Sequence, residues 1–342
     1  MALSVLSKGV PLRHYACVVR LFLVSGITSR IAYGISPQSA DTSQGEPLSF
    51  GRLIPAKTTM VTAWEVPRNP LTDRSLGESR SADQIRRGFK IFTRTPWEAP
   101  RFTGNKLSCG SCHLNAGQRE RALPMVGVAS AFPEYNKREA RVFSLKDRIV
   151  GCFMRSENAT SVRTSAGHTR STGGHEASYP DTGSAEVGAL AAYITWLSEG
   201  FSRGEKLPWR GHNSISPDSC LPIDKLDPVL GKRLYLNNCR NCHGRYGEGV
   251  QIGDKKAGPL WGRLSWNDGA GVARIYTLAG FIRYAMPYLD PGSLSDAEAQ
   301  HIAAYINSLP RPKYPLKDRD YLVGGIPIDA VYYEKRHPSK NP

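Results

Sequence analysis

The chain has 342 residues, 40% of them hydrophobic, and carries a net charge of +15 at neutral pH. This length allows two domains with additional segments, and the apolar fraction is ordinary for a packed core. A basic surface attracts many kinds of anion. The sequence has no lysine-rich tract with interleaved aromatic residues, so we expect no nucleic-acid partner.

Residues 1–34 have the composition of a secretion signal. A basic stretch precedes the short apolar run 21–27, and small residues follow at 32–34. The run is too short to span a bilayer. We expect a cleaved signal peptide, with an uncleaved anchor as the alternative. Residues 35–80 are rich in Ser, Pro, Thr and Arg and predict an irregular extension.

A first helix should begin near Ser81. Ile85, Phe89 and Phe92 fall at positions i, i+4 and i+7, which places them on one helical face. Pro96 is expected to end this helix.

Two copies of the pattern Cys-x-x-Cys-His follow. They consist of Cys109, Cys112 and His113, and of Cys239, Cys242 and His243. Two thiols at this spacing can reach the two vinyl groups on one edge of a porphyrin, and the adjacent His can bind the iron. The pattern predicts two covalently attached haem c groups. Paired disulfides or one four-cysteine zinc site are the alternatives, but neither needs a His after each second Cys.

Haem is attached to this pattern outside the bacterial cytoplasm. The two motifs therefore predict export to the periplasm, which agrees with the leader at 1–34.

The helices around the motifs divide the chain into similar halves. Helices are expected at 184–198 in the first half, and at 228–238, 278–284 and from Ser295 in the second. The tetrapeptide Ala-Ala-Tyr-Ile occurs in the closing helix of each half. A small class I cytochrome c domain has this order of elements: a helix, the motif, a ligand loop and a closing helix. We predict a mainly α fold of two fused class I cytochrome c domains, each with one covalently bound haem c.

The boundaries follow from these elements. We place the N-terminal domain at 81–200, with an insertion at 159–183 that is rich in Ser, Thr, Gly and His. A linker at 201–224 leads to the C-terminal domain at 225–310, and a basic tail occupies 311–342.

The motif histidines, His113 and His243, supply one axial ligand to each iron. In the C-terminal domain Met286 is the expected second ligand, and a thioether raises the haem potential. The N-terminal domain offers Met125, Cys152, Met154, His168 and His175. Spacing alone leaves Cys152 open between an axial ligand, a buried free thiol and a disulfide to Cys220.

Several stretches resemble the dihaem thiosulfate dehydrogenases, over about residues 80–310. They are 148–156 (RIVGCFMRS), 259–262 (PLWG), 267–271 (NDGAG), 281–287 (FIRYAMP) and 303–308 (AAYINS). The chain departs from this pattern in the length of the insertion at 159–183. Ala285 precedes Met286 where some members have a competing Lys, so plain His243/Met286 ligation is expected.

The resemblance implies that Cys152 binds the N-terminal haem iron opposite His113, and that Arg138, Arg148 and Ser156 contact the substrate. It implies that two thiosulfates are joined into tetrathionate. Electrons would pass from a His/Cys haem to a His/Met haem and on to a soluble or membrane-linked acceptor, such as another cytochrome c. The sequence favours neither direction of the reaction.

The residue types suit this chemistry, because two dianions repel each other and arginine side chains bind sulfonate oxygens. Arg138, Arg141, Arg148 and Arg155 cluster around Cys152. As a hypothesis, the Cys152 thiolate leaves the iron and forms an S–S adduct with one thiosulfate, which the second thiosulfate attacks.

Two other functions are alternatives. A dihaem electron carrier would have His/Met ligation at both irons, with Met125 or Met154 at the first. A dihaem peroxidase would keep one iron position open.

Overall fold

The computed structural model describes residues 53–55, 60, 62–159, 180–252 and 255–334, with the backbone of 162–163 and 169–170. All of them belong to one compact unit, residues 46–342. The expected signal peptide at 1–34 and most of the insertion at 159–183 lie outside the described residues, as does the end of the expected tail. No helix in the described ranges is long and apolar enough to cross a membrane.

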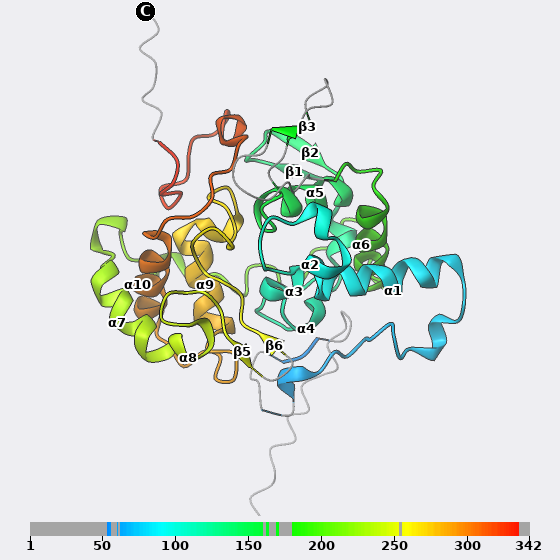
Figure 1. Cartoon of the computed structure of the whole chain (residues 1–342), viewed down its shortest axis with the longest axis horizontal. Coiled ribbons are helices and arrows are strands. Elements are labelled where there is room, and N and C mark those ends of the chain that lie inside the picture. The colour runs from blue at the N-terminus through cyan, green and yellow to red at the C-terminus, as the bar shows by residue number, and fades with distance from the viewer. Residues whose placement is uncertain are drawn as a thin grey trace, which may run out of the picture. The chain divides into compact units, whose positions relative to one another are not determined.

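Helices dominate the described chain (Figure 1), as expected for a mainly α fold. They are α1 (Arg80–Thr93), α2 (Thr95–Glu98), α3 (Cys109–Cys112), α4 (Leu114–Gly117), α5 (Leu145–Arg155), α6 (Ala185–Trp196), α7 (Pro228–Asn238), α8 (Arg240–His243), α9 (Ile275–Ala285) and α10 (Asp296–Asn307). The strands form antiparallel pairs: β1 (Glu134–Asn136) with β2 (Arg141–Phe143), β3 (Val162–Arg163) with β4 (Thr169–Arg170), and β5 (Gln251–Ile252) with β6 (Lys255–Lys256). In the first pair Glu134 lies opposite Phe143.

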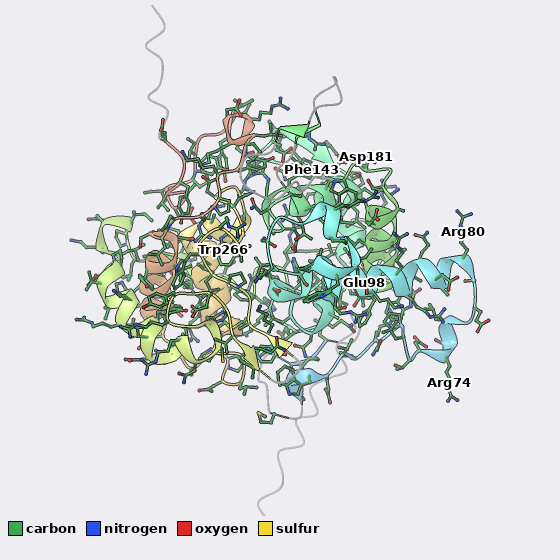
Figure 2. The ribbon with its side chains drawn as sticks, viewed as in Figure 1. Arg74, Arg80, Glu98, Phe143, Asp181 and Trp266 are labelled. Atoms are coloured by element: carbon green, nitrogen blue, oxygen red, sulfur yellow. The ribbon has the colours of Figure 1, made fainter. Side chains whose placement is uncertain are left out.

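The N-terminal half is built on α1 and α6. Ser79 caps α1, and Arg80 at its start projects outward (Figure 2). The predicted apolar face of α1 is buried, and the rings of Phe89 and Phe92 each meet the ring of Tyr193 edge-on at 5.5 Å. Such edge-to-face pairs add to the stability gained from burial.

The two main helices of each half approach closely because one of them carries a glycine. A Cβ at Gly88 in α1 would lie 2.0 Å from a carbonyl oxygen of α6 and 2.8 Å from the Cβ of Tyr193. A Cβ at Gly231 in α7 would lie 2.0 Å from the His301 carbonyl oxygen in α10 and 2.9 Å from the Cβ of Tyr305. The two tyrosines are equivalent in the repeated tetrapeptide, so the sequence repeat reflects a repeated helix crossing.

Each half has its own buried core. The first core gathers residues of α1, α5 and α6, and the second gathers residues of α7, α9 and α10. In the second core the ring of Trp261 meets the rings of Tyr235 and Tyr305 edge-on, at 5.2 and 5.7 Å. The aromatic side chains therefore link the motif segment to the closing helix.

Two helices differ from the expectation. Helix α1 stops at Thr93, before it reaches Pro96. Pro96 instead lies in the first turn of α2, where a missing N–H costs no hydrogen bond. Helix α9 begins at Ile275, earlier than expected, because Asp329 accepts hydrogen bonds from the free N–H groups of its first turn. Asp329 belongs to the tail, so the sequence around α9 gave no sign of this cap.

The helix crossing generates a stability prediction. Gly88→Ala should lower the free energy of unfolding by about 2 kcal/mol, because the added methyl group overpacks a contact with backbone that cannot move aside. Chemical denaturation of the haem-loaded protein measures this change.

Gly188→Ala in α6 is the matched control. The nearest atom to a Cβ at Gly188 is the Oε1 of Gln84 at 3.9 Å, an ordinary contact. This variant should be as stable as the parent or up to about 1 kcal/mol more stable, because alanine favours the helix. Equal stability of the two variants would contradict the close crossing.

Candidate functional site

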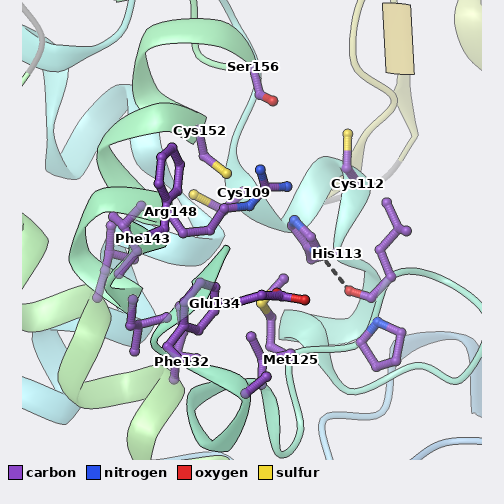
Figure 3. A pocket seen from close by; sticks show the side chains of 18 of the residues that line it. Cys109, Cys112, His113, Met125, Phe132, Glu134, Phe143, Arg148, Cys152 and Ser156 are labelled. Atoms are coloured by element: carbon purple, nitrogen blue, oxygen red, sulfur yellow. Dashed lines mark hydrogen bonds between the residues drawn. The ribbon is translucent and has the colours of Figure 1, made fainter. Parts of the chain in front are cut away.

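A cavity of about 530 Å³ lies between the first Cys-x-x-Cys-His segment and α5 (Figure 3). The loop 123–137 and the linker residues 207–213 contribute to its wall, as do Trp266 and Val272 from the C-terminal half. Its apolar lining includes Phe92, Phe143, Ile149, Phe153, Leu190 and Ile194.

The first motif forms the short helix α3. Its N-terminus carries a capping box between Ser108 and Ser111, and Thr95 Oγ1 accepts a hydrogen bond from Cys109 N (3.2 Å). Burial raises the pKa of the Cys112 thiol to about 12, helped by nearby Glu157. Both motif thiols are free and line the cavity, and burial raises the pKa of the Cys109 thiol as well.

His113 presents one ring nitrogen to the cavity. Its Nδ1 lies 2.6 Å from the Leu123 carbonyl oxygen (Figure 3). Because a carbonyl can only accept, Nδ1 carries the proton and Nε2 is left as a potential metal ligand. Burial lowers the pKa of His113 to about 4, with the nearby cation of Arg148 acting in the same direction. The imidazole is therefore neutral at physiological pH, as metal binding requires.

Helix α5 supplies the facing wall. Arg148, Cys152 and Ser156 are spaced four residues apart, so they lie on one helical face, and all three line the cavity. Ile149 and Phe153 are buried in the core. Figure 3 shows Arg148 and Cys152 directed into the same space as His113. Within the described chain no carboxylate pairs with Arg148, so its charge is available to an anion.

The other arginines of the sequence cluster do not line the cavity. Arg138 donates to the Tyr321 hydroxyl (3.1 Å) and to the Gly269 carbonyl oxygen. Arg141 pairs with Asp147 (3.1 Å), and Arg155 pairs with the tail. The structure therefore brings Arg148 and Ser156 to Cys152 but leaves Arg138 outside.

The alternatives weighed for the cysteines find no support. The six cysteines of the described chain are all free, so the disulfide between Cys152 and Cys220 is not formed. Among the same residues no group of three or more His, Cys, Asp or Glu side chains could hold a bare metal ion. Met125 lines the cavity and Met154 does not. His168 and His175 lie outside the described residues.

The donor set fits a haem group. A neutral imidazole, a pair of uncharged thiols and an apolar wall surround the cavity. Trp209 and Trp266 also line it, and their buried Nε1–H groups have no hydrogen-bond acceptor in the described chain. Buried donors of this kind need an acceptor, which haem propionates would provide.

The histidine of the second motif is held in the same way as His113. His243 Nδ1 lies 3.1 Å from the Gly258 carbonyl oxygen, and burial lowers the pKa of this histidine. Met286 follows α9 directly and packs, partly buried, against a cluster that includes Leu114 of the first half. Cys242 is exposed to solvent.

Sequence reasoning missed three cavity residues. Trp209 lies in a segment assigned to a linker, and Trp266 belongs to the other half of the chain. Glu157 is 3% exposed, and burial raises the pKa of its carboxyl group well above the usual range. Its place directly after Ser156 was the only signal in the sequence.

Comparisons with known proteins agree with this arrangement. Residues 93–202 match the family model described as SoxA/TsdA, cytochrome c domain. Residues 227–306 match the model described as cytochrome C oxidase, cbb3-type, subunit III. Both halves are therefore cytochrome c domains, the class of domain that binds haem c, and the predicted fold class is confirmed.

Curated relatives cover both halves. The thiosulfate dehydrogenase of Stutzerimonas stutzeri is 36% identical over 247 residues, 72% of this chain and 73% of the relative. That of Psychrobacter arcticus is 37% identical over 253 residues, covering 72% and 69%. That of Allochromatium vinosum is 34% identical over 274 residues, covering 78% and 91%.

A solved structure is also similar. The thiosulfate dehydrogenase (TsdBA) from Marichromatium purpuratum, in its as-isolated form, superimposes with a TM-score of 0.62 at 33% identity. The match covers 75% of this chain and 51% of that one, so the matched region spans about half the length of the solved chain.

The start of α5 generates a prediction about pH. Ser144 N donates to Asp147 Oδ2 (2.9 Å), and Asp147 N donates to Ser144 Oγ (3.1 Å). Burial alone would raise the pKa of Asp147, but hydrogen bonds from Ser144 and Arg141 outweigh it and lower the pKa below 3.8. A carboxylate of this kind stabilises the fold above its unfolded pKa, and the effect is lost as the pH falls through the folded pKa.

Asp147→Ala should therefore lower the free energy of unfolding by about 1 kcal/mol near neutral pH. The difference from the parent should begin to shrink below about pH 4, near the pKa of an unfolded Asp. It should be lost as the pH falls through the lower pKa of the folded parent, where the Asp147 carboxylate becomes protonated. Denaturation curves at several pH values measure this. Lys146→Ala, an exposed neighbour, is the control, and a pH-independent loss in Asp147→Ala would contradict the assignment.

Proposed function

Because this chain belongs to the thiosulfate dehydrogenase family, we propose that it joins two thiosulfate ions into one tetrathionate. The observation that carries this proposal is the face of α5 on which Arg148, Cys152 and Ser156 line one cavity with His113. The face combines a cation with no carboxylate partner among the described residues, a sulfur nucleophile and a hydroxyl. These are the groups that an anionic sulfur substrate requires.

We propose two covalently attached haem c groups. Cys109 and Cys112 would attach the first, and His113 and Cys152 would bind its iron. Cys239 and Cys242 would attach the second, and His243 and Met286 would bind its iron. When bound, each haem accepts and passes on one electron at a time.

The chemistry of this site is governed by charge. Each thiosulfate is a dianion, so a second one is repelled by the first unless the site supplies positive charge. Arg148 is the cation that α5 contributes to the cavity, which Lys137 and Arg210 also line. The planar guanidinium group of Arg148 suits sulfonate oxygens. Ser156, two turns further along the helix, can donate a hydrogen bond to the same anion.

The Cys152 sulfur is the proposed nucleophile. It forms an S–S bond with the terminal sulfur of the first thiosulfate, and two electrons leave the site in this step. The second thiosulfate then attacks the bound sulfur and displaces the Cys152 thiolate. One tetrathionate and two electrons result from two thiosulfates, and no proton is consumed or released.

The electrons must leave through the C-terminal domain. Cys242 is exposed, and Arg240, Arg245 and Tyr246 around it are also exposed. We propose that a soluble or membrane-linked acceptor, such as another cytochrome c, receives electrons here. The site of action is the periplasm, where haem is attached to these motifs.

A dihaem electron carrier is the second candidate, because Met125 lines the same cavity and offers a thioether instead of Cys152. In such a carrier Cys152 would have no chemical role. Substitution of Cys152 therefore distinguishes the two functions.

Cys152→Ala should retain both haems and lose roughly a thousandfold or more in turnover, because the nucleophile is removed. The measurement is thiosulfate-dependent ferricyanide reduction, with tetrathionate quantified as product. Cys220→Ala, which changes a thiol packed against the C-terminal core, should keep full activity. Full activity in Cys152→Ala would refute the mechanism and favour the carrier.

Arg148→Gln should raise KM for thiosulfate about tenfold or more, since a charge-assisted contact to the anion is lost. Steady-state kinetics measure this at constant ionic strength. Arg141→Gln removes the same charge from a residue that pairs with Asp147 outside the cavity. An equal change in KM for both variants would show that only the overall surface charge matters.

A further inference from the structure

The end of α5 is held by a buried ion pair with the tail. Arg155, the last residue of α5, is 6% exposed, and Asp320 is 1% exposed. Arg155 Nη1 donates to Asp320 Oδ2 and Arg155 Nη2 donates to Asp320 Oδ1, both at 2.7 Å. This bidentate geometry fixes the direction as well as the position of the guanidinium group.

Further groups complete the surroundings of this pair. The guanidinium carbon of Arg155 lies 4.0 Å from the ring centroid of Tyr314, and Tyr333 donates a hydrogen bond to Asp320 (2.5 Å). Arg155 also donates to Glu139 (3.0 Å) and to the Gly269 carbonyl oxygen (3.1 Å). Its charge is therefore compensated within the protein, in contrast to that of Arg148.

The backbone at the end of α5 is fixed as well. Asn267 Nδ2 donates to the Met154 carbonyl oxygen (2.8 Å), and Asn267 N donates to the Arg155 carbonyl oxygen (3.1 Å). Asn105 Nδ2 donates to the Ser156 carbonyl oxygen (2.6 Å). These bonds satisfy carbonyl groups that a helix end leaves without partners.

The tail also holds the loop before α5. Tyr321 N donates to the Arg138 carbonyl oxygen (2.7 Å), and the Arg138 side chain donates to the Tyr321 hydroxyl (3.1 Å). Asp320 and Tyr321 are adjacent, so one point of the tail holds both the end of α5 and the loop that leads to it. This point lies outside residues 93–202 and 227–306, the ranges matched by the two family models.

We propose that Arg155 and Asp320 are a positioning pair, through which the tail sets Cys152 and Ser156 in the cavity. Ser156 follows Arg155 directly, and Cys152 lies one turn before it. A shift of the end of α5 would therefore move both residues relative to His113 on the opposite wall of the cavity. The inference rests on the proposed function, because it assigns to the tail the geometry of the thiosulfate site.

A role in stability alone would not account for the pair. A buried ion pair adds little net stability over apolar residues of the same size, because both charges must leave water. The directional hydrogen bonds of such a pair instead restrict the arrangement of the two segments that carry the charged side chains. Positioning errors of about 1 Å can change enzyme rates by roughly a hundredfold.

Asp320→Asn tests the proposal in the haem-loaded full chain. We expect kcat/KM for thiosulfate to fall roughly ten- to a hundredfold. We also expect the electron paramagnetic resonance signal of the N-terminal ferric haem to change, because Cys152 no longer has one fixed position.

Asp329→Asn is the matched control. Asp329 lies in the same tail and is also 1% exposed, but it accepts from Arg274 (2.8 and 3.0 Å) and Tyr276 N (3.1 Å) of the C-terminal half. It should lose stability without a change in kcat/KM or in the resonance signal. Identical kinetics and spectra for the two variants would overturn the proposal.

Failure of the proposed function and failure of a variant to fold can both be distinguished from failure of this proposal. If the parent chain makes no tetrathionate, the proposed function fails, while the resonance spectra of the two variants still test the positioning. If Asp320→Asn does not fold, the double variant Arg155→Met, Asp320→Leu removes both charges together and should fold. Parent-like kinetics and spectra in that double variant would also overturn the proposal.

Discussion

The close crossing of two helices, which a glycine permits, is the constraint on which each half of the molecule depends. At Gly88 and Gly231 one helix lies against a carbonyl oxygen of the other, so no larger side chain fits. The crossing places Tyr193 and Tyr235, whose hydroxyls donate to carbonyl oxygens just after the motif histidines (2.7 and 2.6 Å). A packing contact in the core is thereby transmitted to the segments that would hold iron.

The basic cluster around Cys152 divides into one cation that lines the cavity and others whose charges are bound within the protein. Arg148 lines the cavity without a carboxylate partner in the described chain, whereas Arg138 and Arg155 are bound by backbone and tail groups. Arg148 and Arg155 meet different environments because α5 turns them to different sides, whereas Arg138 lies before this helix. Of the three, only Arg148 brings its charge to the cavity.

The sequence was sufficient for features that depend on local spacing. The two motifs, the helix expected near Ser81 and the helix expected from Ser295 were all found where the chain pattern placed them. Features that depend on distant segments could not be read in the same way. Trp266 reaches the first cavity from the other half, and Asp329 caps α9 from the tail. No local sequence pattern predicts either contact, because only tertiary packing brings Trp266 to the cavity and Asp329 to α9.

The position of Asp320 has a consequence for biosynthesis. A chain is made and exported from its N-terminus, and the residues around Asp320 follow both cytochrome domains. Under the proposed attachment, the segment with Cys109 and Cys112 could be modified as soon as it emerges, because that step would need only local spacing. Helix α5 obtains its final anchorage only after the tail arrives. If the first haem is held as proposed, its attachment and the positioning of Cys152 are separate events, and the second of them waits for nearly the whole chain.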